Sequence, residues 1–123
     1  MPFVTLLTNL KLAALPKDIM PRLITHLSPL LNKPAQNFNW VCETEKNMSK
    51  GPEVSDAPMY WLKIESIGSF EDPKTSNTIT PEIFKFFTDE LKINQDNIVM
   101  TFYNLRTSDV AKSGNTVEVL SRI

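Results

Sequence analysis

The sequence contains one cysteine, Cys42, and one histidine, His26. One cysteine cannot form an intrachain disulfide, a CxxC redox pair or a thiolate metal site, so a reducing compartment is the expected environment. One histidine excludes a histidine-rich metal cluster, and it excludes a Ser-His-Asp triad unless His26 itself serves. At helical spacing His26 falls beside Arg22 and Thr25, off the apolar positions, which predicts a solvent-facing side chain. We expect no metal and no cofactor.

The chain also lacks an excess of charge and any long hydrophobic run. Its 13 Lys and Arg residues nearly balance 14 Asp and Glu residues, so nucleic acid and anionic membranes are not expected as partners. No segment approaches the roughly 20 apolar residues of a membrane span, and the start lacks the basic region and cleavage site of a signal peptide. The expected location is cytoplasmic, with any secretion by a route that uses no signal peptide.

The length of 123 residues predicts a single domain over residues 1–123, because one hydrophobic core commonly serves roughly 100–150 residues. Hydrophobic residues make up 41% of the chain and charged residues 22%, so the chain is too apolar for wholesale disorder. A folded globular protein is expected.

The first half of the chain predicts a strand, a helix and a second strand. Residues 2–8 form a short apolar run rich in strand formers. Asp18 is a capping residue before an apolar stripe at helical spacing. That stripe consists of Ile19, Met20, Leu23, Ile24, Leu27, Leu30 and Leu31. Residues 39–44 supply the second strand.

The second half repeats the plan. Residues 59–66 alternate apolar and charged side chains, which predicts a half-buried strand. Thr80 followed by Pro81 is a cap with proline at the first helical position, and it predicts a helix over residues 81–92. Residues 98–103 form the closing strand.

Two βαβ units side by side predict an α+β fold, a four-stranded mixed sheet with both helices on one face. The other face is left uncovered, although the first strand is apolar on both sides, with Phe3 and Leu7 opposite Val4 and Leu6. Such a face needs a partner layer, so association of identical chains is expected. The tail, residues 116–120, could add an edge strand to a neighbour.

Pro2 directly follows Met1, and a small residue there normally permits removal of the initiator methionine. Removal leaves a secondary amine at the start of a strand. A free α-amino group titrates near about 7.7–8.0, and a poorly solvated cavity or a nearby cation lowers its pKa further. Such a nitrogen can act as a general base at physiological pH. Taken alone, Pro2 favours a structural role over a catalytic one, since Met-Pro starts are common.

Several ordered landmarks give Pro2 a context. They are Met1-Pro2, Thr8-Asn9, Pro16, Lys33-Pro34, Ser66-Ile67-Gly68 and Asp96 before the last strand. With them the chain resembles the macrophage migration inhibitory factor and D-dopachrome tautomerase family over nearly its whole length. The resemblance implies a homotrimer, a catalytic N-terminal proline, and pockets between neighbouring subunits.

The resemblance also implies roles for individual residues. Pro2 matches the base that moves a proton between the α-carbon and the enol oxygen of a keto acid. Lys33 matches the residue that binds the substrate's carboxylate or carbonyl, and its charge would help to keep Pro2 neutral. Ile67 matches a position whose backbone hydrogen-bonds the substrate and whose side chain lines the pocket, while Ser66 and Gly68 shape the turn.

The sequence departs from the family pattern around the rest of the pocket. Val99 and Thr101 align with a tyrosine and an asparagine that the neighbouring subunit contributes in the inhibitory-factor branch. Val110 keeps an apolar pocket position, but Lys112 replaces a pocket aromatic residue. These changes predict an altered substrate preference and a weaker activity. The two-cysteine motif of that branch is also missing, so thiol oxidoreductase activity is not expected.

Two functions therefore stand as hypotheses. The first is a keto–enol tautomerase acting on phenylpyruvate-like or dopachrome-like compounds, with cytokine-like activity beside it. The second is a signalling ligand that binds a cell-surface receptor or an intracellular partner, with vestigial catalysis. Tautomerisation by the mature protein and by Pro2→Gly separates the two.

Overall fold

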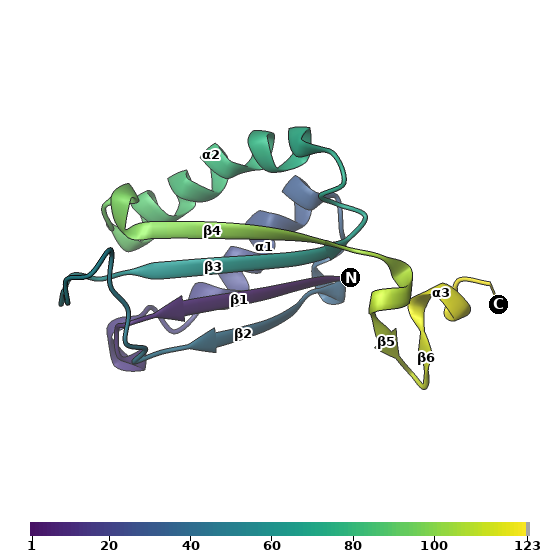
Figure 1. Ribbon diagram of the computed structural model, residues 1–123, viewed down its shortest axis with the longest axis horizontal. Helices are drawn as coiled ribbons and strands as arrows, with labels where there is room; N and C mark the ends of the chain where they lie inside the picture. The colour runs from purple at the N-terminus through teal and green to yellow at the C-terminus, as the bar shows by residue number, and fades with distance from the viewer. Residues whose placement is uncertain (123) are drawn as a thin grey trace.

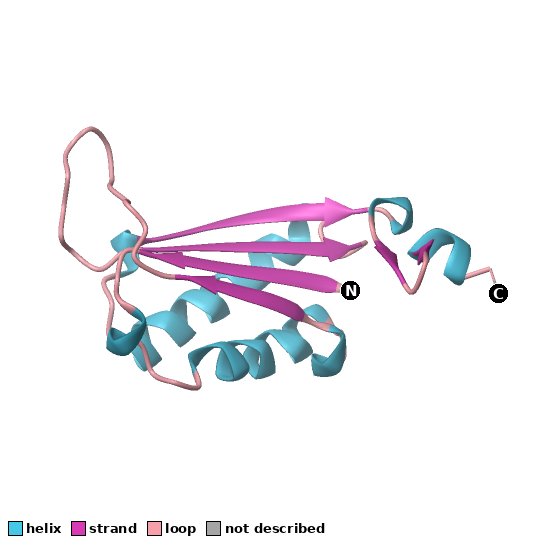
Figure 2. Cartoon of the chain, turned by 90° about the horizontal axis from the view of Figure 1, so that it is seen from below, coloured by secondary structure: helices cyan, strands magenta, loops and turns pink. Residues whose placement is uncertain are grey.

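A computed structural model describes residues 1–122. Its centre is a mixed four-stranded sheet with two long helices on one face, which confirms the predicted α+β fold (Figures 1 and 2). The strands are β1 (Pro2–Thr8), β2 (Asn39–Glu43), β3 (Tyr60–Ile67) and β4 (Ile98–Leu105), in the order β2-β1-β3-β4. β1 runs parallel to β2 and antiparallel to β3, and β3 runs parallel to β4. The predicted strand ends differ from these by one or two residues.

The helix α1 (Ile19–Leu31) begins where the sequence predicts, but without the predicted cap. The carboxylate of Asp18 accepts no hydrogen bond from the first helical turn. It instead accepts a hydrogen bond from Nη1 of Arg22 at 3.3 Å, one turn further along the helix. An ion pair on the helix surface therefore replaces the capping bond.

The helix α2 (Pro73–Leu91) corrects the sequence prediction, because it begins about two turns before Pro81. The start signal is Asp72 followed by Pro73, with Oδ1 of Asp72 accepting a hydrogen bond from the Lys74 amide at 2.9 Å. The pair Thr80-Pro81 has the same chemistry but lies inside the helix, where the Thr80 hydroxyl donates to the Ser76 carbonyl at 2.6 Å. Pro81 is exposed there, so water can solvate the carbonyl that loses its helical partner.

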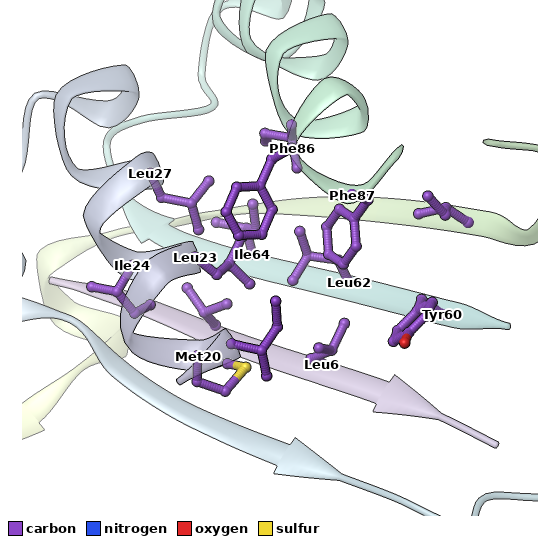
Figure 3. Packing of buried hydrophobic residues seen from close by; sticks show 14 of the residues in the cluster. Leu6, Met20, Leu23, Ile24, Leu27, Tyr60, Leu62, Ile64, Phe86 and Phe87 are labelled. Atoms are coloured by element: carbon purple, nitrogen blue, oxygen red, sulfur yellow. The ribbon is translucent and has the colours of Figure 1, made fainter. Parts of the chain in front are cut away.

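The hydrophobic core lies between the sheet and the two helices (Figure 3). Alternate residues of β1 and β3 point to the helices and are almost completely buried, among them Val4, Leu6, Leu62 and Ile64. The helices contribute Leu23 and Leu27 from α1 and Ile83 and Phe87 from α2. The period-two burial of the strands and the helical stripe of α1 both confirm the sequence pattern.

His26 does not face solvent freely, contrary to the prediction. Its Nε2 lies 3.0 Å from the backbone carbonyl oxygen of Glu82, and its ring stacks on Phe86 with the centroids 5.1 Å apart. These contacts join α1 to α2. The helical spacing separates His26 from the apolar stripe of α1, but it gives no information about where α2 packs, and α2 covers His26.

The second face of the sheet has no covering layer within residues 1–122, as Figure 2 shows from the side. Phe3 and Leu7 of β1 are only half-buried on this face. Exposed apolar side chains accompany them on the other three strands: Val41, Trp61, Val99 and Tyr103. The uncovered face is thus confirmed, and association through it stays a prediction.

Residues 116–120 of the tail do not form the strand that was expected to add to the sheet edge of a neighbour. Two short strands, β5 (Ala111–Lys112) and β6 (Asn115–Thr116), pair as a hairpin, and α3 (Val117–Leu120) follows. The Thr116 hydroxyl caps α3 by accepting a hydrogen bond from the Val119 amide at 3.2 Å. This unit projects past the end of β4, near the N-terminus (Figure 1). Within the described residues, no helix is long and apolar enough to cross a membrane.

Because the core lies on one side of the sheet, the same Leu-to-Ala substitution should have very different effects on stability at two positions. Leu62 is 0% exposed beneath the helices, whereas Leu12 is 70% exposed. Leu62→Ala should lower the free energy of unfolding by about 2–5 kcal/mol, because it removes buried methyl groups and leaves a cavity. Leu12→Ala should change it by less than about 0.5 kcal/mol. Urea denaturation measures both, and equal losses would contradict this location of the core.

Candidate functional site

The candidate site lies at the end of the sheet where the chain begins. The antiparallel pairing of β1 with β3 places Pro2 directly opposite Ser66. Both residues are fully buried on the face that the helices cover. The Ser66 hydroxyl is 2.6 Å from the Ser69 hydroxyl, and this hydrogen bond spans the turn after β3. The sequence landmarks Pro2 and Ser66, which are far apart in the chain, are therefore neighbours.

The turn after β3 depends on Gly68. Its φ of 72° lies in the left-handed region, which costs a residue with a side chain about 1–2 kcal/mol. The Gly68 amide donates to the Leu105 carbonyl at 3.0 Å, which ties the turn to the end of β4. Ile67 is held between β3 and this turn, and its carbonyl points toward the end of α1.

Lys33 reaches that carbonyl from the C-terminal end of α1. Asn32 adopts the left-handed conformation with φ of 53°, and the Lys33 amide donates back to the Ser28 carbonyl at 3.1 Å. This is the Schellman arrangement that commonly ends helices. The Ser28 hydroxyl donates to the Lys33 carbonyl at 2.6 Å, and Nζ of Lys33 donates to the carbonyl of Ile67 at 3.3 Å. Lys33 thus lies at the same end of the sheet as Pro2.

The electrostatics of this end act on the terminal amine. With Met1 in place, burial lowers the pKa of the Met1 amino group below its ordinary value, and the positive charges of Lys33 and then Lys112 lower it further. Each of these effects disfavours the protonated amine. The Pro2 nitrogen itself is an amide in the chain that carries Met1, and it becomes basic only when Met1 is removed.

The sequence does not indicate that Lys112 lies at this site. It shows Lys112 only as the replacement of an aromatic residue, but the hairpin of β5 and β6 brings it close enough to influence the N-terminal amine. Figure 1 shows this hairpin beside the start of β1. The turn at Ser113-Gly114 was a visible hairpin signal. The side of the sheet to which the hairpin folds was not readable from the sequence.

Of the other predicted pocket residues, Val110 directly precedes the hairpin that carries Lys112, whereas Val99 and Thr101 lie far from Pro2 within one chain. Val110 is buried in the segment after β4, where its carbonyl accepts a hydrogen bond from the Val117 amide at 2.8 Å. Val99 and Thr101 lie near the start of β4, whereas the residue of β4 in register with Ser66 is Asn104. Val99 is therefore about 17 Å from that end, at about 3.3 Å per residue. One chain does not bring Val99 and Thr101 to Pro2.

Among residues 1–122, no group of three or more His, Cys, Asp or Glu side chains could hold a metal ion. The chemistry available at the candidate site is therefore that of an amine, two lysines and backbone carbonyl groups. Such a site attracts an anion and can exchange a proton with it.

These features define an α+β protein with a cationic site around its N-terminal amine. The chain belongs to the macrophage migration inhibitory factor family, whose model, described as Macrophage migration inhibitory factor (MIF), matches residues 1–118. This confirms the resemblance drawn from the sequence landmarks.

Similar proteins of known name agree with this assignment. D-dopachrome decarboxylase-B of Xenopus laevis is 32% identical over 120 residues, which cover 98% of this chain and 100% of the relative. D-dopachrome decarboxylase of Mus musculus is 31% identical with the same coverage. Both are similar to this chain over its whole folded part, which supports a function of the tautomerase or inhibitory-factor kind.

Solved structures show the same fold. The macrophage migration inhibitory factor from Trichinella spiralis has a TM-score of 0.82 at 22% identity, covering 93% of this chain and 98% of that one. The factor from Oncomelania hupensis has a TM-score of 0.83 at 19% identity, covering 99% of this chain and 87% of that one. The order of helices and strands is thus common to chains of low sequence identity.

Proposed function

We propose that this protein is a keto–enol tautomerase of phenylpyruvate-like or dopachrome-like compounds, with Pro2 as its general base after removal of Met1. The observation that carries the proposal is the position of Pro2, which is buried opposite Ser66 at the end of the sheet where Lys33 bonds the Ile67 carbonyl. At this end, burial, Lys33 and Lys112 lower the pKa of the Met1 amino group, and we expect the same causes to act on the Pro2 amine once Met1 is removed. A neutral secondary amine has a free lone pair and can accept a proton near neutral pH. Membership in a family with D-dopachrome decarboxylase relatives supports the same reaction class.

In the proposed reaction, the lone pair of the Pro2 nitrogen removes a proton from the α-carbon of the keto acid. The electron pair of that C–H bond forms the C=C bond of the enol, and the carbonyl oxygen receives the proton. Nζ of Lys33, already hydrogen-bonded to the Ile67 carbonyl, binds the carboxylate or the carbonyl oxygen. Its charge stabilises the negative charge that develops on oxygen in the transition state. The reverse sequence ketonises an enol.

Lys33 and Lys112 have distinct parts in this proposal. Lys33 is held by α1 and by its bond to the Ile67 carbonyl, so it offers the fixed anchor for the substrate. Lys112 lies on an exposed hairpin and acts at longer range on the amine. The pair also favours substrates that carry negative charge, because the site holds two positive side chains.

The proposed cleft is completed by a neighbouring copy, which contributes Val99 and Thr101. The apolar side chains Val41, Trp61, Val99 and Tyr103, exposed on β2, β3 and β4, support association through the uncovered sheet face. The distance of Val99 from Pro2 within one chain supports it as well. The assembly that this proposal requires is the homotrimer.

The first prediction concerns Pro2. The Pro2→Gly substitution should reduce phenylpyruvate tautomerisation by about a hundredfold or more, because a positioned general base contributes roughly 10²–10⁴-fold. Mass spectrometry of the N-terminus must first establish that Met1 is absent from both proteins. Equal rates for the two processed proteins would remove Pro2 from the mechanism.

The second prediction concerns pH. We expect the causes that lower the pKa of the Met1 amino group to act on the Pro2 amine as well. Activity should therefore be full above the pKa of the Pro2 amine and fall as the pH drops through it, because protonation blocks the base. Lys112→Ala removes a positive charge, so the amine pKa rises and the acid limb of kcat/KM moves to higher pH. Lys17→Ala, at the other end of α1 from Lys33, removes the same charge as a control. Identical shifts in both variants would contradict a local effect of Lys112.

The third prediction concerns assembly. Multi-angle light scattering of the purified protein should give the mass of three chains. Val41→Lys places a charge on the uncovered face, where Val41 is exposed, and should shift the mass toward that of one chain. A wild-type protein that stays monomeric at micromolar concentration would overturn the shared cleft.

The second candidate function is that of a signalling ligand for a receptor or an intracellular partner, with vestigial catalysis. The observation that favours it is Val99 and Thr101, which replace an aromatic wall and an amide donor in the proposed cleft. Under this reading the processed wild-type protein and Pro2→Gly would both lack activity. The proposed location for either function is the cytoplasm, with any secretion by a route that uses no signal peptide.

A further inference from the structure

An apolar groove, here called the edge groove, lies between β2 and residues 12–20. β2 is an edge strand of the sheet, paired only with β1 (Figure 1). Val4 and Leu6 point to the helices and are in register with Trp40 and Cys42, so these two side chains also lie on the helix side. Val41 between them belongs to the uncovered face. The edge groove is thus on the opposite side of the sheet from the surface proposed for association.

The edge groove has the size and lining of a ligand site. Its volume is about 660 Å³, within the roughly 300–1,000 Å³ that is usual for small-molecule sites. The lining includes Leu15, Ile19 and Met20, which are buried at the edge of the hydrophobic core. It also includes Leu12 and Trp40, which are exposed. Large exposed apolar side chains around a concave surface mark an interaction site.

Cys42 lies where the edge groove meets the core. Its side chain is partly buried against the core residues, and burial raises the pKa of its thiol above the ordinary value. The thiol is therefore uncharged at neutral pH and behaves as a small apolar group. This part of the groove favours a hydrocarbon group over a polar one.

Lys17 supplies the one charge in the lining of the edge groove. Its side chain is exposed, and the carboxylate of the adjacent Asp18 is paired with Arg22 at 3.3 Å. Among the described residues, those that line the groove include no carboxylate that would compete for the Lys17 ammonium group. An apolar surface with a single cation beside it is complementary to a ligand with a hydrocarbon chain and one negative charge.

We infer that the edge groove binds a free medium-chain aliphatic carboxylate, with its alkyl chain against Leu12 and Trp40 and its carboxylate at Lys17. The lining consists mainly of aliphatic side chains, and the flexible Met20 can adapt to a chain that has no fixed shape. This site goes beyond the proposed function, because Pro2, Lys33 and Lys112 are not among its lining residues.

Fluorescence titration tests this inference. Trp61→Phe leaves Trp40 as the sole tryptophan, so its emission reports on the edge groove. Decanoate, added below the concentration at which it forms micelles, should change the emission to saturation. Affinity should rise by up to about fourfold for each CH2 group between hexanoate and decanoate. Decylammonium has the same chain with the opposite charge and should bind more weakly. Equal affinities for the two ions, or no change at millimolar decanoate, would overturn the inference.

Two variants separate the charge from the apolar surface. Lys17→Glu should weaken decanoate binding by about two- to fivefold, since exposed ion pairs contribute modestly, and should leave decan-1-ol binding unchanged. Leu12→Glu removes an apolar contact and should weaken the binding of both ligands. Lys85→Glu is the matched control, because Lys85 is exposed on α2, outside the groove lining, and the net charge changes equally. Losses for decanoate that are equal in Lys17→Glu and Lys85→Glu contradict the assignment of the carboxylate to Lys17.

Cys42 gives a second readout in the wild-type protein. It is the only cysteine of the chain, so mass spectrometry after iodoacetamide treatment reports on access to the edge groove. Decanoate should slow the labelling, with half of the effect at the concentration found by fluorescence, and butanoate should not.

Two results of the labelling experiment assign the edge groove to another occupant and overturn the inference. In the first, the thiol becomes inaccessible without ligand as the protein concentration rises from nanomolar to micromolar, which means that a second copy covers the groove. In the second, vesicles of phosphatidylcholine and phosphatidylglycerol protect the thiol but monomeric decanoate does not, which means that a membrane surface covers it.

Discussion

The antiparallel pairing of β1 with β3 is the constraint on which the candidate site depends. It places the first residues of the chain beside the last residues of β3, with Pro2 opposite Ser66. The backbone hydrogen bonds of this pair fix the register, and a slip of one residue would turn Val4 and Leu6 out of the core. The position of the terminal amine is therefore stabilised by the same burial that stabilises the sheet.

A second constraint is the end of α1. The left-handed Asn32 stops the helix and directs Lys33 toward the Ile67 carbonyl, while the hairpin of β5 and β6 brings Lys112 to the same end. Two cations near an amine are unfavourable for its protonated form, and the energy of folding maintains this arrangement. In the proposed function, this end of the sheet combines an amine that is kept neutral with positive charges that attract an anionic substrate.

The uncovered face links the two ends of the sheet in the proposed enzyme. Lys33 and Lys112 lie near the N-terminal amine, whereas Trp61 and an apolar cavity lie at the far end of the sheet. Within one chain these regions are separated by most of the length of β4. In the proposed homotrimer, a second copy would cover part of this exposed face.

The sequence alone determined the α+β class, the four strands, the existence of both helices and the one-sided core, because each depends on local hydrophobic periodicity. The landmarks Pro2, Lys33 and Ile67 lie at one end of the sheet, and the roles that the resemblance implies for them stay predictions. The local signals for a helix start were ambiguous in α2. Both Asp72-Pro73 and Thr80-Pro81 fit a helix start, and only the packing of α2 selects between them. Tertiary structure decided three other features: the fold of the tail, the position of Lys112 near the N-terminal amine, and the contact of His26 with Glu82. Each joins segments that are distant in the sequence, and a local pattern does not say where a distant segment packs.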